Sequence, residues 1–185
     1  MTIWELRCAS VNDYAMAVPL NPGDVSAGLF RIDGKPLEWK RPPRIGFADS
    51  TRKNHERPPA DVSAMVPGAM VLNAHAHAVL APFLSAFGQL LELDSEGAPG
   101  PRFFYNVTHL VRCVDVEHSE KNELGRIRRE VFDLSKVPAE AAVFKDPATA
   151  RSRIYVNDAG KAVIDQLIAS AGLSGIECGM LEPTL

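Results

Sequence analysis

The sequence predicts an α+β fold in which a mixed, mainly antiparallel sheet carries two packed helices, and three observations support this class. Two segments have apolar residues at helical spacing, and each lies between short runs typical of strands. Residues 103–116 are rich in β-branched and aromatic residues, which favours a strand covered on both faces. Six prolines fall within residues 33–67 and favour an irregular surface stretch with at most short strands.

The first helical segment lies between two predicted strands. Residues 70–72 form a short apolar strand, and Asn73 follows as a candidate N-cap. Gly88 is predicted to end the helix, and residues 90–93 resume as a strand. Pro82 is expected to kink or split the helix, because proline lacks the backbone donor. The apolar stripe consists of Val79, Leu80, Phe83, Leu84 and Phe87.

The same pattern recurs near the C-terminus, shifted by 84 positions. Residues 154–156 are a predicted strand, Asn157 is the candidate cap, Gly172 ends the helix, and residues 176–178 are the return strand. Each cap lies 15 positions before its glycine. The match indicates either a duplicated strand–helix–strand unit or two separate solutions to packing a helix on a sheet. The second stripe consists of Val163, Ile164, Leu167, Ile168 and Ala171.

The rest of the chain contributes shorter strands and an irregular beginning. The further predicted strands are 4–7, 13–18, 126–134 and 142–144. Of these, 126–134 is expected to run antiparallel to 103–116 across a polar turn. We expect residues 1–41 to form an N-terminal segment and residues 42–185 the α+β domain, together one compact unit.

Composition and charge limit the classes of partner. The chain has 185 residues, 46% of them hydrophobic, which suits one domain with an ordinary core. The net charge of −3 argues against nucleic acid or an anionic membrane, since both require a clustered basic surface. The basic run 126–129 is followed by Glu130 and Asp133, so we interpret it as a solvated strand face. No segment approaches the ~20 apolar residues that cross a bilayer.

Cysteine usage and the N-terminus predict a cytoplasmic protein. The chain does not begin with a basic region followed by an apolar run, so no secretory signal is predicted. The three cysteines, Cys8, Cys113 and Cys178, are odd in number and far apart. They are expected to be free, mostly buried thiols in a reducing compartment.

Histidines are the first candidates for metal binding or catalysis. On a helix, His75 and His77 point about 200° away from each other, whereas helical zinc sites need a spacing of three or four. His109 is expected to be a hydrogen-bonded core histidine, because Asp115 lies ~20 Å farther along an extended strand. No nucleophile elbow, phosphate loop or C-x-x-C motif is present. We therefore predict no catalytic residue, cofactor or metal, and do not expect an enzyme.

A polar turn between the strands predicted at 103–116 and 126–134 carries the candidate partner-binding residues. Four carboxylates within nine positions repel one another, and a cationic partner relieves that repulsion. They lack the ligand spacing of an EF-hand loop, and the alternative is a solvated loop with no partner. The four residues are Asp115, Glu117, Glu120 and Glu123.

The order of several segments is similar to that of a known family. They are Phe104–Val107, Cys113–Ser119, Val143–Phe144, Ile154–Asn157 and Ala171–Glu177, and the start of the first helix at 70–73 matches the same layout. Over roughly residues 42–182, the chain resembles immunity family eleven of the bacterial polymorphic toxin systems, formerly a domain of unknown function.

The resemblance implies a protein encoded beside a secreted toxin, which binds that cognate toxin or effector and neutralises it. It supplies no catalytic residues, and self-association stays open. An inhibitory interface of this kind buries roughly 1,200–2,000 Å². Many such toxins are nucleases with basic clefts, which a carboxylate-rich turn complements. The alternative from another class is a small metal-dependent hydrolase that uses His75, His77 or the acidic turn.

Overall fold

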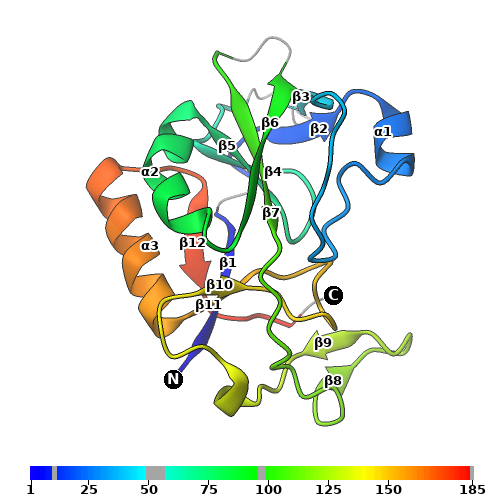
Figure 1. Ribbon diagram of the computed structural model, residues 1–185, viewed down its shortest axis with the longest axis vertical. Coiled ribbons are helices and arrows are strands. Elements are labelled where there is room, and N and C mark those ends of the chain that lie inside the picture. Colours follow the sequence, from blue (N-terminus) through cyan, green and yellow to red (C-terminus); the bar gives the residue numbers. More distant parts are fainter. Residues whose placement is uncertain (10–11, 49–56, 96–98, 184–185) are drawn as a thin grey trace.

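A computed structural model describes residues 1–9, 12–48, 57–95 and 99–183, which form two sheets, a small hairpin and three α-helices (Figure 1). The larger sheet contains, in order across it, β2 Met16–Pro19, β3 Arg44–Ala48, β6 Gly88–Ser95, β7 Arg102–Val107, β5 Met70–Asn73 and β4 Val62–Ala64. The smaller sheet contains β10 Val143–Phe144, β11 Tyr155–Asn157, β1 Ile3–Cys8 and β12 Ile176–Gly179. The hairpin pairs β8 Glu120–Lys121 with β9 Ile127–Arg129.

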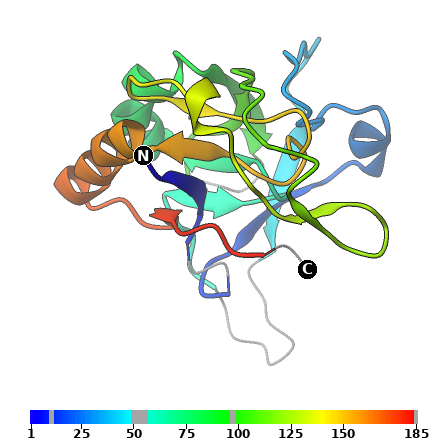
Figure 2. The same ribbon diagram turned by 90° about the horizontal axis from the view of Figure 1, so that it is seen from below.

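The α+β class with mainly antiparallel strands is confirmed. Among the named strands of the described chain, only β3 and β6 pair in parallel. The helices are α1 Pro22–Ser26, α2 Ala74–Leu84 and α3 Asp158–Ala171, with a 3₁₀ turn η1 at Leu134–Lys136. Here the sequence prediction missed α1, and it expected one sheet where the structure has two. Helices α2 and α3 contact each other on one flank of the molecule, and the hairpin lies on the opposite side (Figure 2).

Both predicted strand–helix–strand segments enclose a third strand. In the larger sheet, β7 lies between β5 and β6 and runs antiparallel to both. In the smaller sheet, β1 lies between β11 and β12 in the same way. The helices cover one core shared by the two sheets, which includes Leu6 of β1, Leu80 and Leu84 of α2, and Ile164 of α3. The first strand of the chain is therefore an integral part of the C-terminal sheet.

Both predicted helix caps are confirmed. The side chain of Asn73 accepts a hydrogen bond from the amide of Ala76, and that of Asn157 accepts one from Gly160, each at 2.8 Å. Each Asn is also the last residue of its strand, so it joins strand and helix directly. Gly172 ends α3 in the left-handed conformation, with φ of 64°, as glycine permits.

The expected end of the first helix is wrong. Helix α2 ends at Leu84 with Ser85 as its C-cap, and Gly88 begins β6 instead. A Cβ at Gly88 would lie 2.3 Å from the carbonyl oxygen of Asn106, so glycine is needed for close approach of the strands. Pro82 does not split α2, which continues through it and ends two residues later.

The long strands predicted at 103–116 and 126–134 are also wrong in extent. Strand β7 ends at Val107, after which the amides of Thr108 and His109 both bond to the carbonyl of Phe87. The chain then leaves the larger sheet for a second core that contains Val111. Apolar residues on both faces of 103–116 therefore reflect two successive cores. Strand β9 covers only three residues, but the predicted antiparallel pairing of 126–134 with 103–116 is confirmed at one bridge, between Val114 and Phe132.

The two caps should differ in their contribution to stability. Asn73→Ala should cost about 0.5–2 kcal/mol, the usual value of an N-cap, because among the described residues its half-buried amide donates to Asp61 alone, which keeps its hydrogen bonds from Ser174. Asn157→Ala should cost about 2–4 kcal/mol, because its buried amide also donates to the carbonyls of Pro138 and Glu140 at 2.7 and 2.6 Å. Chemical denaturation of both variants measures the difference, and equal losses would contradict the assigned role of the Asn157 amide.

Candidate functional site

Residues 110–134 surround the β8–β9 hairpin, and we call this segment the hairpin lobe (Figure 1). Five of the nine large apolar side chains that are exposed in the described part of the chain lie on it. Leu124, at the tip of the hairpin, is 78% exposed. The other four are Leu110, Val116, Val131 and Leu134. Exposed apolar side chains of this kind can take part in binding other proteins, and Leu124 at the hairpin tip is the most exposed of them.

The carboxylate of Asp115 stabilises the predicted acidic turn by accepting hydrogen bonds from other residues of that turn. One carboxylate oxygen accepts from the amides of Glu117 and His118 at 3.1 Å, and the other lies 2.7 Å from Nδ1 of His118. The hydrogen bonds from the side chain and amide of His118 lower the pKa of Asp115. Ser119 donates to the carbonyl of Asp115 and accepts from the amide of Val131. Asp115 therefore has a structural role in this turn.

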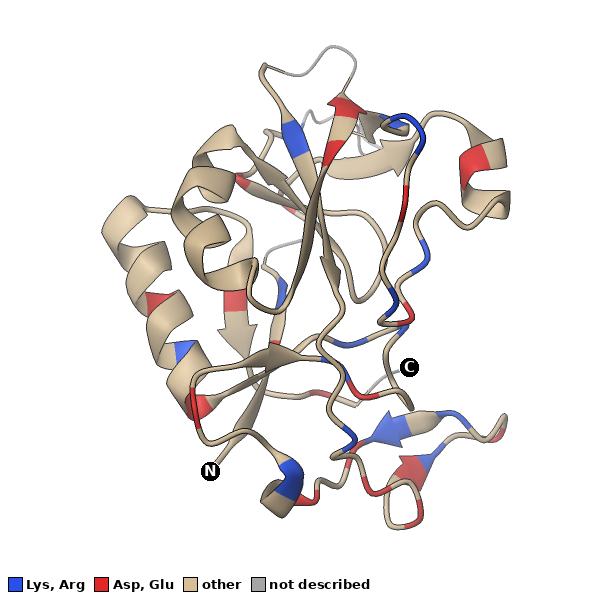
Figure 3. Ribbon diagram, in the orientation of Figure 1, with Lys and Arg blue, Asp and Glu red and all other residues tan. Residues whose placement is uncertain are grey.

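Glu120, another predicted partner-binding residue, lies opposite Arg129 in the β8–β9 hairpin, next to basic side chains. Glu120 lies 3.6 Å from Arg128 and 3.9 Å from Arg129. Glu117 and Glu123 are exposed, and neither forms an ion pair with any residue that the structure describes. Between residues 115 and 129, four basic side chains balance the four carboxylates, as the alternating colours in Figure 3 show. The turn is therefore a surface of mixed charge rather than an acidic one.

The base of the lobe is fixed to the body of the protein. Asp146, a buried carboxylate, accepts hydrogen bonds from the amides of Cys113 and Val114, both at 2.8 Å. Phe132 packs its edge against the ring of Tyr155, with centroids 5.3 Å apart. Both chain segments that enter the lobe are therefore held to the body of the protein.

A buried cluster of charges lies behind the lobe. Arg153 donates to Glu5 at 2.6 Å and to Glu130 at 3.1 Å, and Tyr155 donates to the same Glu130 oxygen at 2.9 Å. Burial raises the pKa of Glu5, and the nearby charges of Arg153 and Arg7 oppose the rise. The cluster joins β1 to the lobe and to β11, so its role is structural.

The two candidate metal-binding histidines contact different neighbours, as their helical spacing predicts. Nδ1 of His75 lies 3.3 Å from Asp61, whereas the ring of His77 stacks on Phe103 with centroids 3.8 Å apart. Within the described ranges, no three His, Cys, Asp or Glu side chains are grouped as a metal site requires. The pair therefore does not form a shared site with each other.

Asp61, His75 and Ser174 lie together but not in the order of a catalytic triad. Ser174 donates from its hydroxyl to Asp61 at 2.9 Å, so the carboxylate rather than the histidine holds that hydroxyl. Burial tends to raise the pKa of Asp61, but hydrogen bonds from Ser174, Asn73 and His75 lower it to about 2. Asp61 thus stays ionised and links the entry to α2 with the loop after α3.

The remaining histidine and the cysteines have local structural contacts. Nδ1 of His109 lies 2.9 Å from the carbonyl oxygen of Val143, so the predicted hydrogen bond is present, although the ring is only half-buried. All three cysteines are free, with Cys113 buried and Cys8 and Cys178 half-buried. Burial raises the pKa of each thiol to about 12, which keeps it protonated and weakly nucleophilic.

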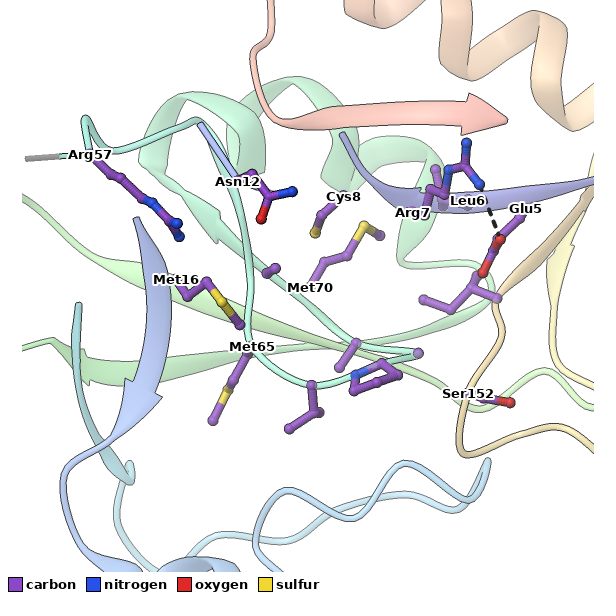
Figure 4. A pocket seen from close by; sticks show the side chains of 16 residues that line it. Glu5, Leu6, Arg7, Cys8, Asn12, Met16, Arg57, Met65, Met70 and Ser152 are labelled. Atoms are coloured by element: carbon purple, nitrogen blue, oxygen red, sulfur yellow. Dashed lines mark ion pairs between the residues drawn. The ribbon is translucent and has the colours of Figure 1, made fainter. Parts of the chain in front are cut away.

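A cavity of about 310 Å³ lies where β1 approaches β4 and β5 (Figure 4). Its wall is mainly apolar, and its central side chains are Met16, Met65, Met70 and Cys8. Polar side chains border it on two sides, with Arg57 and Asn12 on one side and Glu5 and Arg7 on the other. Small-molecule sites typically combine an apolar wall with a few polar groups in this way.

Comparisons with protein-family models and with curated protein sequences find no match for this chain. None of the described helices is both long and apolar enough to span a membrane. We therefore infer function from the hairpin lobe, the cavity and the order of segments in the sequence.

Proposed function

We propose that this protein is a cytoplasmic immunity protein that binds a cognate bacterial toxin or effector and neutralises it, without catalysing a reaction. The observation that carries the proposal is the hairpin lobe, whose exposed apolar side chains alternate with charges on a base fixed by Asp146. The resemblance of the segment order to that of immunity family eleven supports the same function.

The lobe has the chemistry of a specific protein interface. Its apolar side chains supply surface that association removes from water, and the charges of both signs around them set register and partner choice. A fixed base reduces the entropy lost on binding, because the interface is ordered before the partner arrives. In this arrangement Leu124 is the central contact, and Glu117 and Glu123 are the carboxylates available to a cationic partner.

We also propose that the two strand–helix–strand units are copies of one ancestral unit, which together form the scaffold of the protein. The shift of 84 positions, the two Asn caps and the enclosed antiparallel strand support common origin. The hairpin lobe lies between the two copies in the sequence, where an insertion leaves both units intact.

Charge reversal on the lobe should reduce protection without unfolding the protein. Glu117→Lys with Glu123→Lys should weaken binding of a cationic toxin at least about tenfold and slow its association, while stability changes little because both side chains are exposed. The matched control reverses two exposed carboxylates outside the lobe, Glu38→Lys with Glu140→Lys. Co-expression with the toxin encoded beside this protein measures survival, and purified proteins give the affinity.

Leu124→Ser tests the apolar part of the lobe in the same assay. It should also weaken binding at least about tenfold, because a central apolar side chain contributes more to affinity than its charged rim. Full protection by both lobe variants would remove the lobe from the interface. A neighbouring gene product that is neither toxic nor bound by the unaltered protein would overturn the immunity function itself.

A further inference from the structure

The cavity between β1 and the β4–β5 hairpin is bordered by a charged group, Arg57, that pairs with none of the residues that the structure describes. Arg57 borders the cavity, and its Nε is buried without a hydrogen-bond partner among the described residues. Figure 4 shows its guanidinium directed toward the cavity interior, on the same side as the amide of Asn12. The guanidinium also forms no ion pair with any residue that the structure describes, so a ligand carboxylate in the cavity would supply its counter-charge.

The other charges at the cavity already have partners. Glu5 pairs with Arg153 at 2.6 Å, and Arg7 pairs with Glu177 at 2.8 Å and with Glu5 at 3.6 Å. Glu5 and Arg7 lie on the side of the cavity opposite Arg57 (Figure 4). Among the described residues, the cavity therefore offers a cation without a counter-charge at one end only, which favours an anionic head group next to Arg57.

The rest of the cavity fits a flexible apolar body. Three of the five methionines of the chain, Met16, Met65 and Met70, line it, and unbranched thioether side chains adapt to apolar ligands. Because a water molecule takes about 30 Å³ of liquid volume, a cavity of about 310 Å³ has room for roughly ten non-hydrogen atoms.

We propose that this cavity binds a small aliphatic carboxylic acid, with its carboxylate on Arg57 and its hydrocarbon chain against the three methionines. Octanoate has the required size and charge and is the probe of choice. The site is separate from the hairpin lobe, so its occupancy is measured on the purified protein without any toxin. If the protein proved not to be an immunity protein, octanoate binding would be unaffected. If octanoate did not bind, the proposed immunity function would be unaffected.

Methyl NMR of methionine-labelled protein provides the test with an internal control. Octanoate should shift the methyl signals of Met16, Met65 and Met70 in a saturable manner. The signals of Met1 and Met180, which are exposed and do not line the cavity, should stay unchanged. Equal shifts at all five methyls, or no saturation at millimolar octanoate, would overturn the proposal.

Two comparisons test the role of the charge. Arg57→Met should weaken octanoate binding about tenfold or more, whereas Arg41→Met, at an exposed arginine that does not line the cavity, should not. Octylamine has the same length and the opposite charge, and it should bind at least about tenfold more weakly than octanoate. Equal affinities for the acid and the amine would show unspecific apolar uptake and refute the assigned orientation.

A cavity-filling variant tests the location. Ala64→Phe places a ring in the wall of the cavity and should abolish the methyl shifts while the far-ultraviolet circular dichroism is retained. Undiminished binding by the folded variant would place octanoate elsewhere. If that variant does not fold, the Arg57→Met and octylamine comparisons still decide the question.

Discussion

Replacing Lys145 by methionine should destabilise the protein by about 3 kcal/mol or more. Lys145 has no exposed surface, and its ammonium donates to the carbonyl oxygens of Ile32, Gly68 and Ala150 at 3.0, 2.8 and 2.8 Å. Methionine keeps most of the side-chain volume but leaves these three carbonyls without their donor. Each unsatisfied buried carbonyl costs about 1–3 kcal/mol. Urea denaturation at pH 7 measures the loss.

The contribution of Lys145 to the free energy of unfolding should also depend on pH. Burial lowers its pKa to about 7, against the opposing charge of Asp33, whereas a lysine in the unfolded chain titrates near ~10.4. Between these values the unfolded chain binds more protons than the folded protein, so stability rises with pH. Below pH 7 both states are protonated, and this contribution no longer changes.

Two controls separate this effect from other groups. The difference in the free energy of unfolding between the wild type and Lys145→Met should grow from pH 7 to pH 9. The two proteins have the same other titratable groups, so the effects of those groups cancel in the difference. Lys40→Met, at an exposed position, should change stability by less than about 0.5 kcal/mol at either pH. A pH-independent difference would show that the folded and unfolded states titrate alike at Lys145, and a difference below about 1 kcal/mol would refute its bridging role.

Replacing Arg153 by methionine should cost about 3–5 kcal/mol. Arg153 is 4% exposed and is the shared partner of two carboxylates, Glu5 and Glu130, whose side chains are also largely buried. Removing the cation leaves both negative charges uncompensated in a poorly solvated place, which is the costly way to break a buried ion pair. Arg7→Met should cost about 1 kcal/mol or less, because its pairs with Glu177 and Glu182 lie at the surface and its contact with Glu5 is longer, at 3.6 Å.

Removing the two negative charges should reverse much of that loss. In the Arg153→Met background, Glu5→Gln with Glu130→Gln should recover at least about half of the lost stability, since the amides need no counter-charge. The hydrogen bond from the Tyr155 hydroxyl can be kept, because the amide introduced by Glu130→Gln still offers an oxygen that accepts it. No recovery would show that Arg153 stabilises the protein through packing and its other hydrogen bonds rather than through charge.

Much of the local structure could be predicted because it depends on neighbours in the chain. The apolar stripes, Asn73 and Asn157 define the two main helices, since a 3.6-residue period and a cap act over one or two turns. Gly88 was misassigned because its role is close contact with Asn106 in another strand, which no local pattern shows. The strand predicted at 103–116 failed for a similar reason, as it crosses from one core to another.

The candidate surface was predicted only in part. The sequence indicates a carboxylate-rich turn, but it does not show that Asp115 is used to build the turn or that Glu120 faces Arg128 and Arg129. Those roles follow from the turn geometry and hairpin register. The apolar side chains of the lobe gave no signal either, because an isolated Leu124 in the sequence resembles any core leucine.

By itself, the sequence determined the α+β class, the two helices with their caps, and the free state of the three cysteines. The tertiary structure alone decided that β1 lies between β11 and β12, that charged side chains are buried, and that a cavity forms beside Arg57. The physical reason is separation along the chain. Arg153 and Glu5 are 148 positions apart, and Lys145 lies 113 positions from Ile32. A buried charge is tolerable only where partners from such distant segments meet it, and only the folded chain brings them together.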